Sequence, residues 1–305
     1  MQRLQRFSLV LLLLCLGVAG AWAQGGKLLV TPGARVAIVG DSITEQKIYS
    51  RFIEAYLTAC VPQLDAHAMQ FGWGGDRTVM FARRMANDAL PFHPTLVTLC
   101  FGMNDGGYRA FTPETGKAFQ DPLLAIVTNF KAAGATVLVG SPGAVDSNAK
   151  YFRNGGTPPA VYNETLGKLG ELAKATADAQ GMPYANLHDT MMDAMAKTKA
   201  ALGEDADVCG TDGVHPGWNG HLIMAYAFLK AMGFDGDLGT ITIDVTGKAT
   251  AENGHKILAV TGRKVDIEST RYPFIVPGAA ADKRSARAML PYLPFNQDLN
   301  RLTLV

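Results

Sequence analysis

The segment RVAIVGDSITE, residues 35–45, joins a short apolar run to a polar turn that contains Asp41 and Ser42. The apolar run, residues 35–40, has the length and composition of a strand that is buried on both faces, as in a parallel sheet. Similar runs recur along the chain, at residues 67–72, 95–102, 135–142 and 183–189. Together these runs predict the five strands of one sheet.

Stretches with helical periodicity separate the apolar runs. The pattern predicts helices at residues 47–60, 76–90, 119–133, 161–180, 190–202 and 217–232. Strands that alternate with helices over about 200 residues indicate a parallel sheet with helices on both faces. We therefore expect a three-layer α/β/α sandwich around a five-stranded parallel sheet.

The first 23 residues have the order of a secretory signal peptide. Arg3 and Arg6 precede the apolar run FSLVLLLLCLGVAG, and AWA follows that run before Gln24. We expect cleavage after Ala23 and a secreted or periplasmic protein. A single-span anchor is the alternative, but the apolar run is short for a bilayer.

Charge argues against several classes of partner. The chain has 28 Lys and Arg against 27 Asp and Glu, and loss of Arg3 and Arg6 with the leader leaves 26 against 27. A nearly neutral chain has no electrostatic reason to bind nucleic acid or anionic lipid. We expect no nucleic-acid partner and no stable membrane anchor after cleavage, and the oligomeric state stays open.

The cysteines carry little chemistry of their own. Cys60, Cys100 and Cys209 remain after the leader is removed, and their spacing matches neither a disulfide framework nor a zinc site. We expect three buried thiols, with a bridge between Cys60 and Cys209 as the alternative.

The pattern of the chain changes near residue 236. Short β-type runs (GTITIDV, KILAVTG and KVDIEST) are followed by a proline-spaced stretch, and the last run, RLTLV, looks like a strand with no closing element after it. We predict a main α/β domain over residues 27–235 and a small β-rich appendage over residues 236–305. The appendage should pack on the main sheet, and whether it is complete stays open.

Polar clusters follow the first three predicted strands, as GDS, GWGGD and GMNDGG. The carboxyl ends of parallel strands share one edge of the sheet, which is where ligands bind in such folds. Ser42 alone would be interpreted as a helix cap. As a nucleophile it would need a base, a group that orients the base, and donors for an oxyanion.

The segment CGTDGVHPGWNGH, residues 209–221, supplies the first two needs. Asp212 and His215 lie three apart in one turn, so the carboxylate can reach Nδ1 of the imidazole and leave Nε2 for a serine. The donors would be the backbone N–H of Ser42, the N–H of a glycine in GWGGD and the side-chain amide of Asn104.

In this order, GDSIT, GWGGD, GMND and DGVHP resemble the SGNH hydrolases of the GDSL esterase family, over roughly residues 35–232. The resemblance implies a flavodoxin-like strand order, 2-1-3-4-5, and neither a cofactor nor a metal. It also implies roles for individual residues: nucleophile Ser42, base His215, orienting acid Asp212, and oxyanion donors Ser42, Gly75 and Asn104.

Neighbouring residues have simpler interpretations. We expect Asp41 to bind loop N–H groups, Asp105 to shape its own loop, and Arg77 to brace the GWGGD loop. The adjacent pair His188 and Asp189 should diverge, with Asp189 capping a helix that begins near Thr190.

Three aromatic residues are candidates for a substrate cleft, and core packing is the competing interpretation of the two tryptophans. They are Trp73, Tyr108 and Trp218.

The motifs lead us to expect a secreted serine esterase that hydrolyses carboxylic esters through an acyl-enzyme. O-acetyl or other short acyl groups on carbohydrate are favoured, because the chain has no long apolar lid segment. A short-chain lipase or lysophospholipase-type esterase is the alternative within that class. From other classes, the alternatives are a metal-dependent phosphoesterase and a non-catalytic glycan-binding module.

Overall fold

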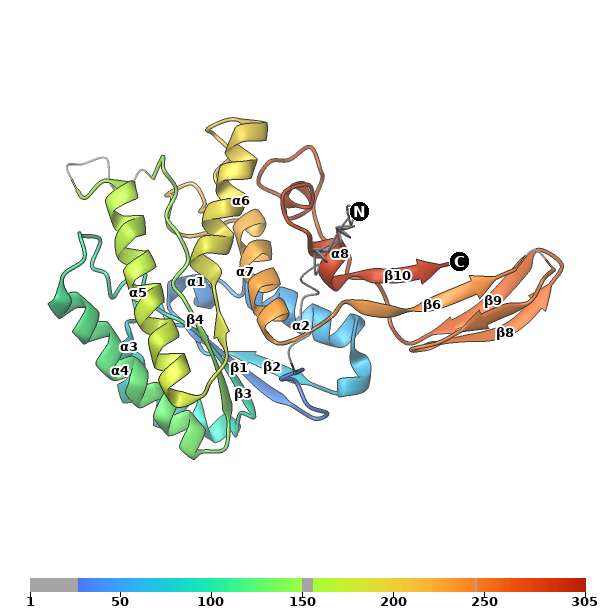
Figure 1. Ribbon diagram of the computed structural model, residues 1–305, viewed down its shortest axis with the longest axis horizontal. Helices are drawn as coiled ribbons and strands as arrows, with labels where there is room; N and C mark the ends of the chain where they lie inside the picture. Colours follow the sequence, from blue (N-terminus) through green and yellow to red (C-terminus); the bar gives the residue numbers. More distant parts are fainter. Residues whose placement is uncertain (1–26, 150–155, 245) are drawn as a thin grey trace, which may run out of the picture.

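The computed structural model describes residues 27–149, 156–244 and 246–305. The predicted signal peptide lies outside these ranges. The centre of the fold is a five-stranded parallel sheet in the order β2-β1-β3-β4-β5 (Figure 1), as expected. Its strands are β1 (Arg35–Gly40), β2 (His67–Gln70), β3 (Leu96–Cys100), β4 (Thr136–Gly140) and β5 (Tyr184–Ala185).

Helices cover both faces of the sheet, which confirms the three-layer sandwich (Figure 1). The α-helices of this layer structure are α1 (Ser42–Glu45), α2 (Ile48–Ala59), α3 (Thr78–Asp88), α4 (Pro113–Ala132), α5 (Pro159–Gln180), α6 (Leu187–Leu202) and α7 (Trp218–Ala231). Short 3-10 turns follow α2 and α3, as η1 (Pro62–Leu64) and η2 (Leu90–Phe92).

Two hydrophobic cores result, one on each face of the sheet. In β1, Val36 and Ile38 pack with α2, α6 and α7, whereas Ala37 and Val39 pack with α3, α4 and α5. This alternation is what a strand with period-two side chains produces when both faces are covered.

The edge strands differ from the prediction. We expected every apolar run to be buried on both faces, but β2 is an edge strand whose residues are alternately exposed and half-buried. The run at 183–189 forms only the two residues of β5. Helix α6 then begins at Leu187 rather than near Thr190, and Asn186, not Asp189, is its cap, since the Asn186 side chain accepts from the Asp189 N–H at 3.1 Å.

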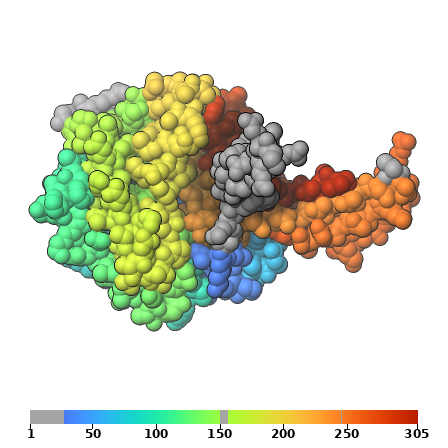
Figure 2. Space-filling view, in the orientation of Figure 1, coloured from blue at the N-terminus to red at the C-terminus, as the bar shows by residue number. Residues whose placement is uncertain are grey.

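The C-terminal segment forms an arm that projects from the rounded body of the molecule (Figure 2). One part is a sheet of order β10-β6-β7, and the other is the antiparallel hairpin β8–β9. The strands are β6 (Asp237–Ile243), β7 (Ala249–Ala251), β8 (His255–Thr261), β9 (Lys264–Ser269) and β10 (Arg301–Leu304). The last run forms β10, as the strand pattern indicated, and β10 pairs with β6 in parallel.

The proline-spaced stretch returns to the body. It contains η4 (Arg287–Met289) and α8 (Phe295–Leu299). The rings of Phe274 and Phe295 pack in a tilted arrangement with centroids 5.3 Å apart, and Phe274 also meets Phe52 of α2 edge-on at 6.1 Å. This stretch packs on α2 and α7 rather than on the main sheet, so the expected packing was wrong, and it contributes to the core that these two helices share.

Cys60, Cys100 and Cys209 are free and buried, as expected of the three thiols. None of the helices in the described part of the chain combines the length and apolar character that a membrane span requires.

Candidate active site

Ser42 and His215 meet at the carboxyl edge of the sheet. Ser42 is the first residue of α1, directly after β1 and Asp41, and its Oγ lies 2.8 Å from His215 Nε2. Residue 215 lies in the turn just before α7. Two segments 173 residues apart in sequence thus place a hydroxyl against an imidazole.

Asp212 fixes the tautomer of His215. Its Oδ2 lies 2.7 Å from His215 Nδ1, and a carboxylate can only accept, so Nδ1 carries the proton and Nε2 faces Ser42 as an acceptor. The other oxygen, Oδ1, accepts the N–H groups of Val214 and His215, both at 2.9 Å. Partial burial acts to raise the pKa of Asp212, but these hydrogen bonds outweigh it and leave the pKa below its ordinary value.

The three residues predicted to donate to an oxyanion lie in loops that follow neighbouring strands. Ser42, the Gly75 loop and the Asn104 loop follow β1, β2 and β3, which are adjacent in the sheet. The backbone N–H groups of Ser42 and Gly75 bond to no described residue. Asn104 Nδ2 donates to the Asp76 carbonyl at 2.9 Å, which uses one of its two N–H bonds and leaves the other. Gly75 has a φ of +75°, where a side chain would be strained.

Arg84, not Arg77, braces the Gly75 loop. The Arg84 guanidinium donates from Nε at 2.8 Å and from Nη2 at 2.6 Å to Asp76 Oδ2, and Nη2 also donates to the Phe71 carbonyl at 2.8 Å. Asp76 is 2% exposed, so this ion pair is largely sheltered from water. Arg77 is exposed, and the prediction that it braces the loop was wrong.

Asp105 holds the Asn104 loop against α3. Its Oδ1 accepts the N–H and the hydroxyl of Thr78, at 2.9 and 2.7 Å, and its Oδ2 accepts the Gly102 N–H at 3.1 Å. The expected role of Asp105 in shaping its loop is confirmed. The link to Thr78 also ties the loop that contains Asn104 to the helix that follows Gly75.

Asp41, beside the serine, is buried and structural, as expected. Its Oδ1 accepts the Ile43 N–H at 3.0 Å, which caps α1. Burial raises the pKa of Asp41 from 3.8 to about 7, with the carboxylates of Asp105 and Asp76 adding to the rise.

Trp73 and Trp218 are exposed rather than packed in the core, at 62% and 46%. Trp218 begins α7, three residues after His215, and leans on Phe52 with ring centroids 5.7 Å apart. The Trp73 ring has the Arg84 guanidinium 5.9 Å from its centroid. Both rings therefore offer free faces close in sequence to the site.

Tyr108 adjoins the Asn104 loop. Its hydroxyl donates to Asn104 Oδ1 at 3.4 Å, and its ring stacks on Tyr162 with centroids 5.0 Å apart. Tyr108 is only partly buried, so it is accessible beside Asn104.

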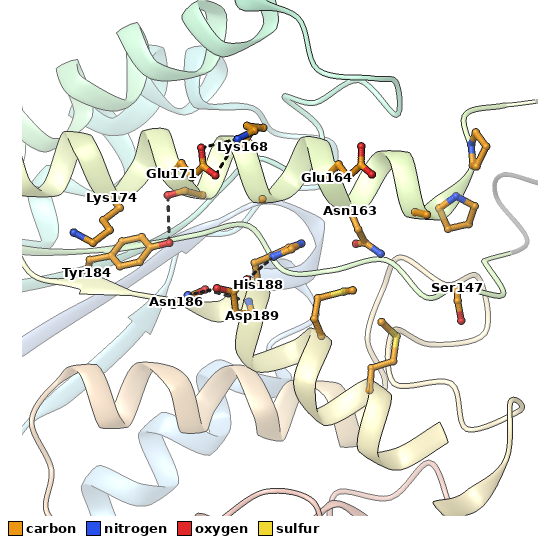
Figure 3. A pocket seen from close by; sticks show the side chains of 17 residues that line it. Ser147, Asn163, Glu164, Lys168, Glu171, Lys174, Tyr184, Asn186, His188 and Asp189 are labelled. Carbon is orange, nitrogen blue, oxygen red and sulfur yellow. Dashed lines mark hydrogen bonds and ion pairs between the residues drawn. The ribbon is translucent and has the colours of Figure 1, made fainter. Parts of the chain in front are cut away.

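The second histidine–aspartate pair lies elsewhere. His188 and Asp189 do not diverge as predicted, because His188 Nδ1 lies 3.0 Å from Asp189 Oδ1. They line a cavity of about 830 Å³ between α5 and α6 (Figure 3), whose lining includes neither Ser42 nor His215. Among the described residues, none is a hydrogen-bond partner of the buried Nε2 of His188, and no hydroxyl bonds to it.

The described residues contain no group of three or more His, Cys, Asp or Glu side chains arranged to hold a metal ion. What they do contain is a hydroxyl, an imidazole and a carboxylate in one hydrogen-bonded chain, on the ligand-binding edge of a flavodoxin-like sheet. Fold and site together define a hydrolase of the α/β type.

The comparison with family models identifies the group. Residues 38–223 match the model of the GDSL-like Lipase/Acylhydrolase family, and the chain belongs to this family. It is accordingly a carboxylic ester hydrolase. A search of curated proteins returned no match.

Solved structures share the fold. A gut microbial diltiazem-metabolizing enzyme is 25% identical to this chain, with a TM-score of 0.75. The match covers 90% of this chain, and this chain spans 66% of that protein's length. Axe2, an acetylxylan esterase from Geobacillus stearothermophilus, is 22% identical with a TM-score of 0.56, covering 68% of this chain and 97% of its own. A hydrolase from the metagenome of Lake Arreo, Spain, is 20% identical with a TM-score of 0.55, and the match covers 68% of this chain and 98% of that protein.

Proposed function

We propose that the protein is a serine esterase in which Ser42 attacks the carbonyl carbon of an ester. His215 Nε2 takes the Oγ proton as the new C–O bond forms, and Asp212 stabilises the resulting imidazolium. The observation that carries this mechanism is the unbroken chain Ser42 Oγ–His215 Nε2 at 2.8 Å and His215 Nδ1–Asp212 Oδ2 at 2.7 Å.

The tetrahedral oxyanion would be held by the N–H groups of Ser42 and Gly75 and by the remaining N–H of Asn104. Collapse of the intermediate breaks the ester C–O bond, and the leaving alkoxide takes the proton from His215. Water then enters, gives a proton to His215, attacks the acyl carbon and releases the acid, while the proton returns to Ser42.

O-acetyl or other short acyl groups on carbohydrate are the substrates that we favour. Exposed tryptophan faces suit stacking on sugar rings, and Trp73 and Trp218 present such faces on the loops of the Gly75 donor and of His215. The structural similarity to an acetylxylan esterase supports this choice.

An ester of a small drug-like or lipid molecule is the second candidate. The similarity to a diltiazem-metabolizing enzyme, at the higher TM-score, favours it. The two candidates are separated by kcat/KM on acetylated xylan, acetylated xylo-oligosaccharides and p-nitrophenyl esters of two to twelve carbons. A carbohydrate substrate predicts the highest kcat/KM on acetylated oligosaccharides. Trp218→Ala should then lower kcat/KM on these oligosaccharides and leave kcat/KM on p-nitrophenyl acetate unchanged. A higher kcat/KM on esters of longer acyl chains would contradict this choice.

The metal-dependent and non-catalytic alternatives are tested by two reagents. A fluorophosphonate should abolish ester hydrolysis and add its mass to the peptide that contains Ser42, whereas a chelator such as EDTA should leave activity intact. Loss of activity in chelator alone, with no adduct, would favour the metal-dependent reaction. Wild-type protein without ester turnover would favour a binding module.

We also propose that the protein is exported, on the strength of the leader pattern in residues 1–23. Expression with its own N-terminus should place activity outside the cytoplasm, with Gln24 as the first residue of the mature chain. An uncleaved N-terminus in the cytoplasmic fraction would contradict this proposal.

A further inference from the structure

The segments that contain Ser42 and His215 are joined at a second point. His221, in the first turn of α7, places Nε2 2.7 Å from Oε1 of Gln46, which ends α1. An amide oxygen only accepts, so Nε2 carries the proton and donates. One hydrogen bond thus links the helix that begins with the serine to the helix that follows the histidine.

The donor side of this link is rigid. His221 is fully buried, and its ring stacks on Tyr49 with centroids 5.9 Å apart and an interplanar angle of 16°. Its backbone N–H donates to the Gly217 carbonyl at 3.0 Å. Tyr49 in turn bonds through its hydroxyl to Thr44 Oγ1 at 2.7 Å. Burial, with a smaller effect of nearby His215, lowers the pKa of His221 to about 3, so the ring stays neutral during catalysis.

The acceptor side needs such support. Helix α1 is a single turn of four residues, too short to be stable by itself. It ends at Gln46, whose N–H donates to the Ser42 carbonyl at 3.1 Å, and the chain then turns through Lys47 at a φ of 60°, a left-handed conformation that a residue other than glycine seldom adopts. A shift of Gln46 would therefore move the backbone of Ser42.

We propose that the His221–Gln46 hydrogen bond positions Ser42 relative to His215 through the reaction cycle. This inference rests on the proposed function. In the acyl-enzyme, Ser42 Oγ is esterified and has no proton, so its hydrogen bond to His215 is absent while His215 must direct water to the acyl carbon. The bond between His221 and Gln46 does not change in that step, and it keeps α1 and the start of α7 in register. His221 and Gln46 are positioning residues.

The first test uses Gln46, because its side chain is exposed and its replacement should not disturb folding. Gln46→Leu should lower kcat for p-nitrophenyl acetate about tenfold with KM within about twofold, since small misplacements of reacting groups cost rate rather than binding. Gln46→Glu keeps an acceptor oxygen and should stay within about threefold of wild type at pH 8.5. The matched control is Gln63→Leu, an exposed glutamine in η1, which should have wild-type kcat.

The second test separates the steps. In stopped flow, Gln46→Leu should slow the steady state at least as much as the initial burst, because deacylation proceeds without the Ser42–His215 bond. His221→Phe keeps the aromatic stack and should lose the same factor, and the double variant should lose about tenfold rather than about a hundredfold. If His221→Phe does not fold, the Gln46 variants carry the test.

Full kcat in Gln46→Leu, or an equal loss in Gln46→Glu and Gln46→Leu, would overturn the positioning role. Failure of the proposed function gives a different result. In that case Ser42→Ala would retain turnover, whatever the Gln46 variants do.

Discussion

Replacement of Asp212 by asparagine should disable the site by reversing one tautomer. The Asn oxygen can replace Oδ1 and keep the two backbone N–H bonds at 2.9 Å, which places the amide nitrogen 2.7 Å from His215 Nδ1. That nitrogen donates, so Nδ1 must become an acceptor and the proton moves to Nε2. Nε2 lies 2.8 Å from Ser42 Oγ, and once Nε2 carries a proton it cannot accept the proton of the Ser42 hydroxyl.

A base in the wrong tautomer costs about 10⁴-fold in kcat, or about 5.5 kcal/mol of barrier. The assay is the steady-state hydrolysis of p-nitrophenyl acetate by Asp212→Asn, with circular dichroism to show an unchanged fold. Asp205→Asn, which changes an exposed carboxylate paired with Lys283, is the matched control and should lose no more than about twofold. A loss below tenfold in Asp212→Asn would refute the role assigned to Asp212.

Three further predictions concern the donors and the buried charges. Asn104→Ala should lower kcat by about 10² to 10³, the typical worth of one oxyanion donor, and an unchanged kcat would exclude Asn104 from the oxyanion hole. Asp41 should make the protein less stable as pH rises, because its pKa is about 7 in the folded protein and 3.8 ordinarily. Between about pH 4 and 7 the folded protein keeps a proton on Asp41 that the unfolded chain has released. The free energy of unfolding should therefore fall over this range by on the order of 4 kcal/mol. Denaturant unfolding of wild type and Asp41→Asn across that range should show a loss of stability that is larger in wild type than in the variant, and parallel curves would contradict it. Lys199→Met should cost about 3 to 5 kcal/mol of stability, because Lys199 Nζ lies 2.8 Å from Asp146 Oδ1 and the two side chains are only 9% and 2% exposed. The control Lys197→Met, which breaks an exposed pair, should cost less than about 1 kcal/mol. Equal losses in the two variants would show that burial of the Lys199–Asp146 pair is unimportant.

The parts of the fold that depend on local pattern could be predicted from the sequence. Strand β1 and helix α2 agree with the predicted ranges to within one residue, because an apolar run and an amphipathic period are local signals. The strand order, in contrast, came from the resemblance of the motifs to a family. The bonds among Ser42, His215 and Asp212 followed from the same motifs, and the structure places these side chains within hydrogen-bond distance.

Features that depend on distant contacts escaped prediction. Nothing near Arg84 distinguishes it from Arg77, because its partners, Asp76 and the Phe71 carbonyl, are brought to it only by the folding of α3 against the Gly75 loop. The pairing of β10 with β6 joins residues about 60 apart, and no local pattern reports it. The Gln46–His221 bond spans 175 residues and was likewise invisible in either segment alone.

The central claim is that Ser42 is the nucleophile, and the most direct measurement is the kcat of Ser42→Ala on p-nitrophenyl acetate. The variant should fold, with the thermal melting curve of wild type, and its kcat should be lower than that of wild type by a factor of roughly 10⁴ to 10⁶, as after removal of a triad serine elsewhere. Turnover equal to wild type in the folded variant would contradict the mechanism, since the Ser42–His215–Asp212 chain would then be structural only.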